Sequence, residues 1–448
     1  MASAAEQMAA NFNMGSFGKA KELHKRIWFT LGALIVYRLG TFLPIPGIDV
    51  GVLQEIFRQN AGGLLGVFDM FAGGAVQRMA IFALNIMPYI SASIIMQLVG
   101  ALVPSIDQLR KEGGEQGRRK INEYTRYLTV VIAAFQAYGI AVGLTHMTGP
   151  GGAAAVLNPG AGFIISTVIT LVGATMFLMW LGEQITSRGI GNGISLLIFA
   201  GIVAGLPQGI GQALELGRTG AIPIFGIIIL FVGALLILAF IVFMERGHRK
   251  VLVQYPKRQV GMKMTTGESS HMPLKINASG VMGPIFASSI LALPMTLSGF
   301  TTADSPEWMQ WIAQNFHHGK PVYMAIYGLL IIFFCFFYTS IIFNPTETAD
   351  NLKKNGGFVP GIRPGKNTAD YFDFVLTRLT VIGAAYIVMV CLLPELLIGE
   401  FGLPFYFGGT SLLIVVSVGM DTVAQIHSHM IAHQYEGLIK KSRLRGTK

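Results

Sequence analysis

The sequence predicts an all-α integral membrane protein with ten transmembrane helices. Of its 448 residues, 52% are hydrophobic and only 12% are charged, whereas soluble domains contain about 25% charged residues. So few charges cannot cover the surface of a soluble globule of this size. The charges are also clustered. The apolar runs between them are about 17 to 25 residues long, the length that a helix needs to cross a hydrocarbon core of roughly 30 Å.

The apolar runs define the spans and their orientation. Their centres lie near residues 35, 91, 134, 171, 198, 232, 285, 332, 386 and 414. Of the 33 Lys and Arg residues, 28 fall in the N-terminal arm, the C-terminal tail and the segments after even-numbered spans. The positive-inside rule then places both termini in the cytoplasm. The first run, from Ile27 to about Pro44, shows no cleavage site of small residues, so we expect it to remain as the first span.

Four segments follow from this topology. They are a cytoplasmic arm at 1–26, two halves of five spans each at 27–213 and 214–426, and a cytoplasmic tail at 427–448. Two loops of the second half, about 245–273 and 344–374, exceed the usual length of about 12 to 15 residues. Both are basic, which favours docking sites for a cytoplasmic partner. The alternative is that these charges, and the net charge of +10, only set the orientation.

A short apolar segment lies between the first two spans. It reads GGLLGVFDMFAGG, Gly62 to Gly74, with a glycine pair at each end. The segment is too short to span and too apolar for a free loop, which is typical of a re-entrant segment. An amphipathic helix lying on the outer surface is the alternative.

Other function classes lack their usual residues. Ion and solute transporters place ionisable residues at mid-membrane, and almost none occur here. Because no nucleotide or hydrolase motif appears, we expect neither an enzyme nor a cofactor. We read His427, His429 and His433 as a solvated helix end rather than a metal site. Cys335 and Cys391 lie in separate apolar runs and are expected to be packing residues.

Two spans share a polar, proline-containing pattern. PYISASI, from Pro88, and PIFASSI, from Pro284, lie in the second and seventh spans. A distance of five spans is what two five-span repeats produce, and paired interruptions point to a site between the halves. Alternatively, the prolines are kinks that neighbouring helices tolerate. Asn85 also needs a buried partner, which the sequence does not name.

Longer motifs carry a resemblance to the SecY family. They are ALNIMPYISASIIMQL, GIGNGISLLIFAG, HMPLKINASGV, NPTETADNLKKNGGFVPGIRPG, TRLT and FYFGGTSLLIVV, and the similarity extends from about Gly18 to the tail. One departure is Gly283-Pro284, where the family often has two prolines. Glycine there is expected to loosen the seventh span slightly.

The resemblance implies two inverted five-helix repeats around a central pore. This pore would conduct unfolded polypeptides and release hydrophobic segments sideways into the bilayer. Its waist would be a ring of aliphatic side chains, which excludes water when idle. The matching positions are Ile86, Ile90, Ile190, Ile194, Ile285 and Ile414. The pairs Ile86/Ile90 and Ile190/Ile194 would each share one helix face.

The resemblance also assigns the polar patterns. The second and seventh spans would form a lateral gate, in which serines ease wetting and prolines act as bend points. The gate positions are Pro88, Ser91, Ser93, Pro284, Ser288 and Ser289. The re-entrant segment would be a plug, with Gly63, Leu64, Leu65, Val67, Phe68, Met70 and Phe71.

Partners are implied by the same family. Lys257, Arg258 and Arg363 match contact sites for the ribosome and the SecA motor, with Gly361 and Pro364 shaping the tip around Arg363. Two small membrane subunits, SecE and SecG, would accompany the chain in the bacterial inner membrane. Its substrates would be signal sequences and unfolded polypeptides. Alternative hypotheses are a secondary transporter of a small solute, which would share inverted repeats and broken helices, and a scaffold subunit.

Overall fold

The computed structural model describes most of residues 21–445. Outside the description lie 60–68, 70–71, 112–113, 148–152, 220–223, 256–258, 261–262, 265–268, 299–305, 308–309, 312–314, 316–319 and 402–407, besides the two termini. The described part is mainly helical, with two small antiparallel pairs of strands.

Helices account for all ten expected spans. They are α3 (Lys21–Gly40), α6 (Met87–Leu102), α8 (Gly114–His146), α9 (Ala161–Arg188), α10 (Gly193–Arg218), α11 (Ile224–Glu245), α12 (Met282–Ser298), α14 (Pro321–Ile342), α16 (Lys366–Phe401) and α17 (Gly409–Arg445). Each expected centre falls inside one of them. Among the described residues, six helices are long and apolar enough to cross a membrane, and three shorter apolar helices accompany them. The protein is therefore a multi-pass helical membrane protein, as the sequence predicted.

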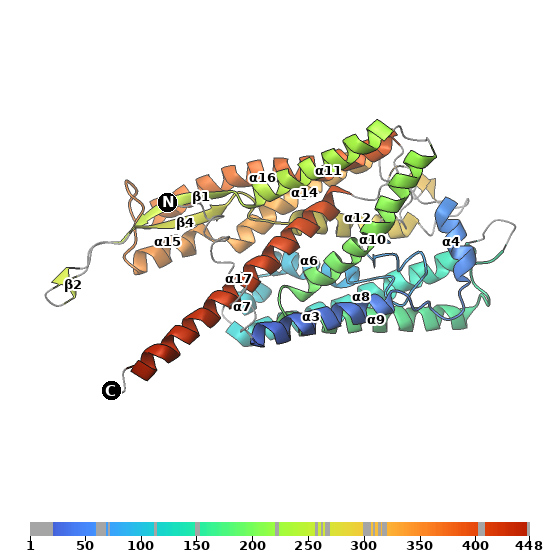
Figure 1. Cartoon of the computed structure of the whole chain (residues 1–448), viewed down its shortest axis with the longest axis horizontal. Coiled ribbons are helices and arrows are strands. Elements are labelled where there is room, and N and C mark those ends of the chain that lie inside the picture. Colours follow the sequence, from blue (N-terminus) through green and yellow to red (C-terminus); the bar gives the residue numbers. More distant parts are fainter. Residues whose placement is uncertain are drawn as a thin grey trace.

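The two halves lie side by side (Figure 1). Helices α3, α6, α8 and α9 form one group, and α11, α12, α14 and α16 form the other. Helices α10 and α17 run between the groups and pack against each other. At one end lie the short helices α7 (Pro104–Lys111) and α15 (Pro345–Lys354) and the strands, and α4 (Val50–Gln59) lies at the other.

The strands belong to the first long loop. β1 (His248–Gln254) pairs with β4 (Ser269–Lys275), and β2 (Gln259–Val260) pairs with β3 (Lys263–Met264). In Figure 1, β1 and β4 extend from the helical body beside α15. The strand pair β1–β4 is called the arm below.

The apolar run from Met79 to Val103 is not one helix. Residues 73–86 form successive turns, and α6 begins only at Met87. Asn85 has a φ of 48°, in the left-handed region. Asparagine enters this region more readily than most residues, so Asn85 suits the bend that separates the turns from α6. The backbone conformation at this bend thus accounts for an asparagine within an apolar run.

Both motif prolines lie in the first turn of their helices. Pro88 follows the N-cap residue Ile86 by two positions, and Pro284 is the third residue of α12. First-turn N–H groups have no acceptor within the helix, so proline removes no hydrogen bond there. The expectation that each proline removes a helical hydrogen bond and acts as a bend point is therefore wrong. They mark where the helices start.

Candidate functional site

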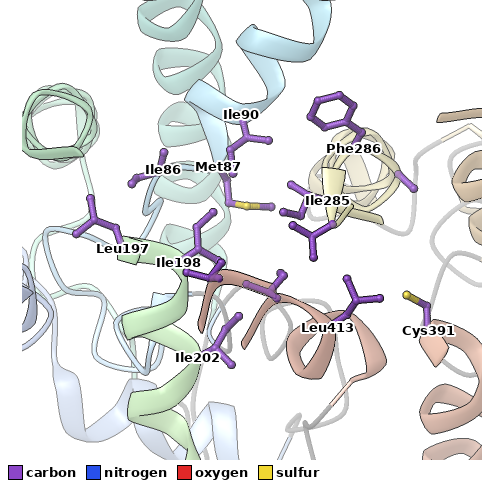
Figure 2. Close-up of a cluster of buried hydrophobic side chains, with 14 of the residues drawn as sticks. Ile86, Met87, Ile90, Leu197, Ile198, Ile202, Ile285, Phe286, Cys391 and Leu413 are labelled. Atoms are coloured by element: carbon purple, nitrogen blue, oxygen red, sulfur yellow. The ribbon is translucent and has the colours of Figure 1, made fainter. Parts of the chain in front are cut away.

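A buried cluster of apolar side chains, called the waist cluster below, lies between the two halves. Ile86 and Ile90 from the start of α6 meet Ile285 of α12 and Ile414 of α17 in one buried cluster, and Ile194 of α10 packs against it. In Figure 2 the labelled side chains of these elements converge from several directions. Ile86 and Ile414 are each only 1% exposed. Five of the six positions that the resemblance selected therefore belong to this cluster or pack against it, and the pore ring itself stays a prediction.

Ile190 does not lie in this cluster. It is buried with Leu23 and Met430 in a separate small group, and its N–H donates to the Thr30 hydroxyl, 3.1 Å away. The expected shared helix face with Ile194 is wrong, because α10 begins only at Gly193. Asn192 caps that helix, and Gly191 before it has a φ of 87°. The left-handed glycine turns the chain, so the helical spacing does not extend back to Ile190.

Helix α10 instead contributes residues further along. Leu197, Ile198 and Ile202 are buried in the waist cluster and are labelled in Figure 2. The resemblance did not point to them. Helical periodicity could have done so, because Ile194, Ile198 and Ile202 follow one another at intervals of four residues and share one face.

The seam beside the waist is formed by α6 and α12, which pack against each other. Ser91 on α6 and Ser289 on α12 are buried. The hydroxyls of Ser288 and Ser289 both donate to the Ile285 carbonyl, over 3.0 and 2.7 Å. On α6, the Ser93 hydroxyl accepts from the Gln97 amide at 3.4 Å. The α12 serines are thus satisfied within their own helix, and their polar groups need no partner across the seam.

Helix α12 is also held closely by α14. A side chain at Gly283 would place its Cβ 2.9 Å from the Cys335 Sγ. Phe286 contacts the rings of Phe334 and Tyr338 edge-on, with centroid distances of 5.7 Å in both cases. The glycine that departs from the family pattern therefore permits a close helix contact.

The seven plug positions named above all lie outside the described residues. Of the segment Gly62 to Gly74, the structure describes Asp69 and residues 72–74. Asp69 is buried there, and its Oδ1 accepts from the N–H groups of Val76 and Gln77 over 2.8 and 2.9 Å. Gly73 and Gly74 follow with φ values of 63° and 85°. A Cβ at Gly73 would meet the Gly201 carbonyl of α10 at 2.9 Å. This glycine pair therefore makes a tight left-handed turn against α10.

The two long basic loops form one folded unit. Gln254 of β1 and Phe358 exchange two backbone hydrogen bonds of 2.9 Å. Val251 and Leu274 of the arm share a buried core with the second loop and the start of α16; its other members are Val359, Phe372, Val375 and Leu376. This unit, the arm together with residues 344–376, is called the basic-end block below. Lys257 and Arg258 lie outside the described residues.

Arg363 stands at an exposed tip of this block. Its neighbour Ile362 packs against the block's core, while Gly361 and Gly365 have φ values of 81° and 109°. The Thr368 hydroxyl donates to the Arg363 carbonyl at 3.0 Å. These contacts hold the backbone of the tip in one shape and leave the guanidinium exposed to solvent.

Two helix groups that meet in a buried aliphatic cluster define a polytopic helical membrane protein. The sequence profile of the SecY family matches residues 80–423. Protein translocase subunit SecY of Escherichia coli K12 is 52% identical over 443 residues, covering 99% of each chain. The corresponding protein of Pseudomonas aeruginosa is 54% identical over 432 residues, covering 96% of each. The chain belongs to the SecY family.

Solved structures share the fold at lower identity. A protein-conducting channel is 18% identical, with a TM-score of 0.60 over 92% of this chain and 93% of that one. Sec61 in a canine ribosome–channel complex is 17% identical, with a TM-score of 0.57 over the same shares. Both likenesses concern the fold.

Proposed function

We propose that this chain is the pore-forming subunit of a protein translocase. It conducts unfolded polypeptides through the waist and releases hydrophobic segments sideways through the α6–α12 seam. The observation that carries this proposal is the waist itself, where branched aliphatic side chains from α6, α10, α12 and α17 meet between the halves. The seam opens beside this cluster, so both routes start from one place.

The chemistry of the waist suits a polypeptide substrate. An unfolded chain presents two backbone polar groups per residue, and each costs several kcal/mol if it is unpaired in lipid. A watery path is needed during transport, and a dry barrier is needed at rest. Aliphatic side chains form such a barrier by dewetting. They also lack fixed hydrogen-bond partners, so they tolerate any passing side chain.

The first test concerns lateral exit. Cysteines introduced at Ser91 and Ser289 should cross-link to the apolar core of a stalled signal sequence, because both residues lie where α6 and α12 meet. A cysteine at Leu235, which is 65% exposed on α11, should not. The native Cys335 and Cys391 are buried, and the unmodified chain gives the background. Cross-links from both seam positions only to mature, polar parts of the substrate would contradict the gate.

In this proposal the re-entrant segment is the plug, and Asp69 ties its end down. Burial raises the pKa of the Asp69 carboxyl to about 6, although the N–H groups of Gln77 and Val76 and the charge of Arg78 act in the opposite direction. Because the carboxyl binds its proton more tightly in the folded protein, protonation stabilises the folded arrangement, and this stabilisation is complete below the unfolded pKa of 3.8. That advantage is lost as the pH rises through about 6.

The plug should therefore be held less firmly at higher pH. Ion leak of the resting channel in planar bilayers should rise between about pH 4 and about pH 7. The pKa change from 3.8 to about 6 corresponds to about 3 kcal/mol at most. Asp69→Asn keeps an acceptor oxygen without the charge, so its leak should stay low and flat. Asp49→Asn, which alters the carboxylate that accepts from Gly51 and Val52, is the control. An equally steep rise in Asp69→Asn would contradict the assignment.

Partners and location complete the proposal. The basic-end block is the docking surface for ribosomes and the SecA motor, and SecE and SecG are the accompanying membrane subunits. The distribution of Lys and Arg supports cytoplasmic termini, and the bacterial relatives support the inner membrane. Purification from native membranes should recover two small single-span proteins with this chain. Recovery of the chain alone would contradict the assignment of these two subunits.

A further inference from the structure

The arm leaves and rejoins the helical body at a single point. Helix α11 ends at Glu245, β1 begins at His248, β4 ends at Lys275 and α12 begins at Met282. The N–H of Ile276 donates to the Gly247 carbonyl at 3.1 Å, which closes the base of the arm. The same chain segment therefore connects the basic-end block to α12.

A carboxylate–amide pair ties this base together. The Asn277 amide nitrogen donates to Glu245 Oε1 at 2.6 Å and to the Gly280 carbonyl at 3.2 Å. Its amide oxygen accepts from the Ser279 hydroxyl at 3.0 Å. Asn277 and Ser279 are each 4% exposed. A buried hydrogen bond to a carboxylate is among the stronger kinds, and leaving its partner unpaired is costly.

Close packing also restricts the base of the arm, because two glycines lie against Ile276. A Cβ at Gly383 of α16 would lie 2.8 Å from the Ile276 carbonyl oxygen. A Cβ at Gly247 would lie 2.5 Å from the Ile276 side chain. Ile276 is thus packed against Gly383 of α16 and against Gly247, which lies between α11 and β1, so residues 276–281 have little freedom to absorb a displacement. Because the arm shares a core with the second loop, this junction is a direct link between the basic-end block and α12.

We infer that Asn277 is a positioning residue which couples the basic-end block to the gate helix α12. A partner bound to the block shifts the arm, and the pair with Glu245 transmits the shift to the start of α12. That start carries Ile285 of the waist and Ser288 and Ser289 of the seam. This inference rests on the proposed function, because the gate and the docking surface are taken from it.

An exchange of the two side chains tests the coupling. Asn277→Asp places two carboxylates at the junction and abolishes the donor. Glu245→Gln with Asn277→Asp restores an amide–carboxylate pair in the opposite direction. Lys275 and Asp421 act electrostatically on the Glu245 carboxylate. The Glu245→Gln single variant therefore controls for the lost charge at that position.

Two properties of the purified complex are measured. One is the affinity for ribosomes. The other is cross-linking of a signal sequence to a photoreactive residue at Ser288, with and without ribosomes. We expect Asn277→Asp to bind ribosomes within about twofold of the unmodified chain but to lose about tenfold of the ribosome-dependent cross-linking. The exchanged double variant should recover most of it, which a purely structural role would not predict once partner binding is intact.

Each other result overturns the inference. Full ribosome-dependent cross-linking in Asn277→Asp shows that the pair transmits nothing. No recovery in the double variant, or a parallel loss of ribosome affinity, shows that Asn277 acts in another way. If Asn277→Asp fails to accumulate in membranes, Glu245→Ala, which removes the acceptor, carries the same expectation. If the unmodified chain cross-links to the signal sequence equally with and without ribosomes, this inference fails alone; if it shows no cross-linking at all, the proposed function fails as well.

Discussion

Replacing Ile414 or Ile90 by asparagine is expected to open the resting channel. Both isoleucines are buried in the waist cluster. An asparagine there loses the apolar transfer free energy and offers hydrogen bonds to water, which together destabilise the closed state by about 3 kcal/mol. This corresponds to an increase of about a hundredfold in the open population. Conductance in planar bilayers should rise, and export of a reporter with a defective signal sequence should rise with it.

Matched variants separate a seal from ordinary packing. Leucine or valine at the same positions should have little effect, because volume-conserving apolar changes cost less than about 1.5 kcal/mol. Asparagine at Ile229, which is 60% exposed on α11, should change neither conductance nor export. An Ile414→Asn channel that stays closed, or an Ile229→Asn channel that leaks equally, would show that the waist is not the seal.

Substitution of Ile190 distinguishes the site seen in the structure from the ring that the resemblance implies. Since it is buried with Leu23 and Met430 outside the waist cluster, Ile190→Asn should raise the resting leak less than Ile90→Asn does. Ile198→Asn should raise it as much, although no motif pointed to Ile198. The reverse order would restore the ring that the family pattern implies.

The second large effect is expected at Arg363. Reversing its charge should leave the protein inserted with unchanged orientation, because many other basic residues set the topology. Motor-driven export should nevertheless fall about thirtyfold, since an exposed arginine on a rigid tip has the character of a binding hot spot. The measurement is SecA-dependent translocation into vesicles of equal channel content.

A control of equal charge change lies in the same block. Lys354 is exposed in the last turn of α15, so Lys354→Glu alters the net charge equally without touching the tip. Its export should remain within about threefold of the unmodified chain, as for a rim charge. Equal losses in both variants would mean that overall charge, rather than Arg363 itself, attracts the partner.

The amino-acid sequence by itself determined the class of this protein and the positions of its apolar spans. Apolar runs of spanning length must become helices in lipid, because unpaired backbone groups are too costly there. The ten span centres therefore fall inside ten helices. The family motifs in the sequence also selected Ile86, Ile90, Ile285 and Ile414. In the structure these four side chains belong to one buried cluster.

Only the tertiary structure decided where the helices start and what their ends contact. Left-handed residues at Asn85 and Gly191 delay α6 and α10, and hydropathy does not reveal such bends because the turns are as apolar as the helices. The delay places Pro88 in a first turn and excludes Ile190 from the waist. The junction of Asn277 with Glu245 joins residues 32 positions apart. Such a pair follows from how α11, α12 and α16 pack, since no local pattern specifies which buried polar groups meet.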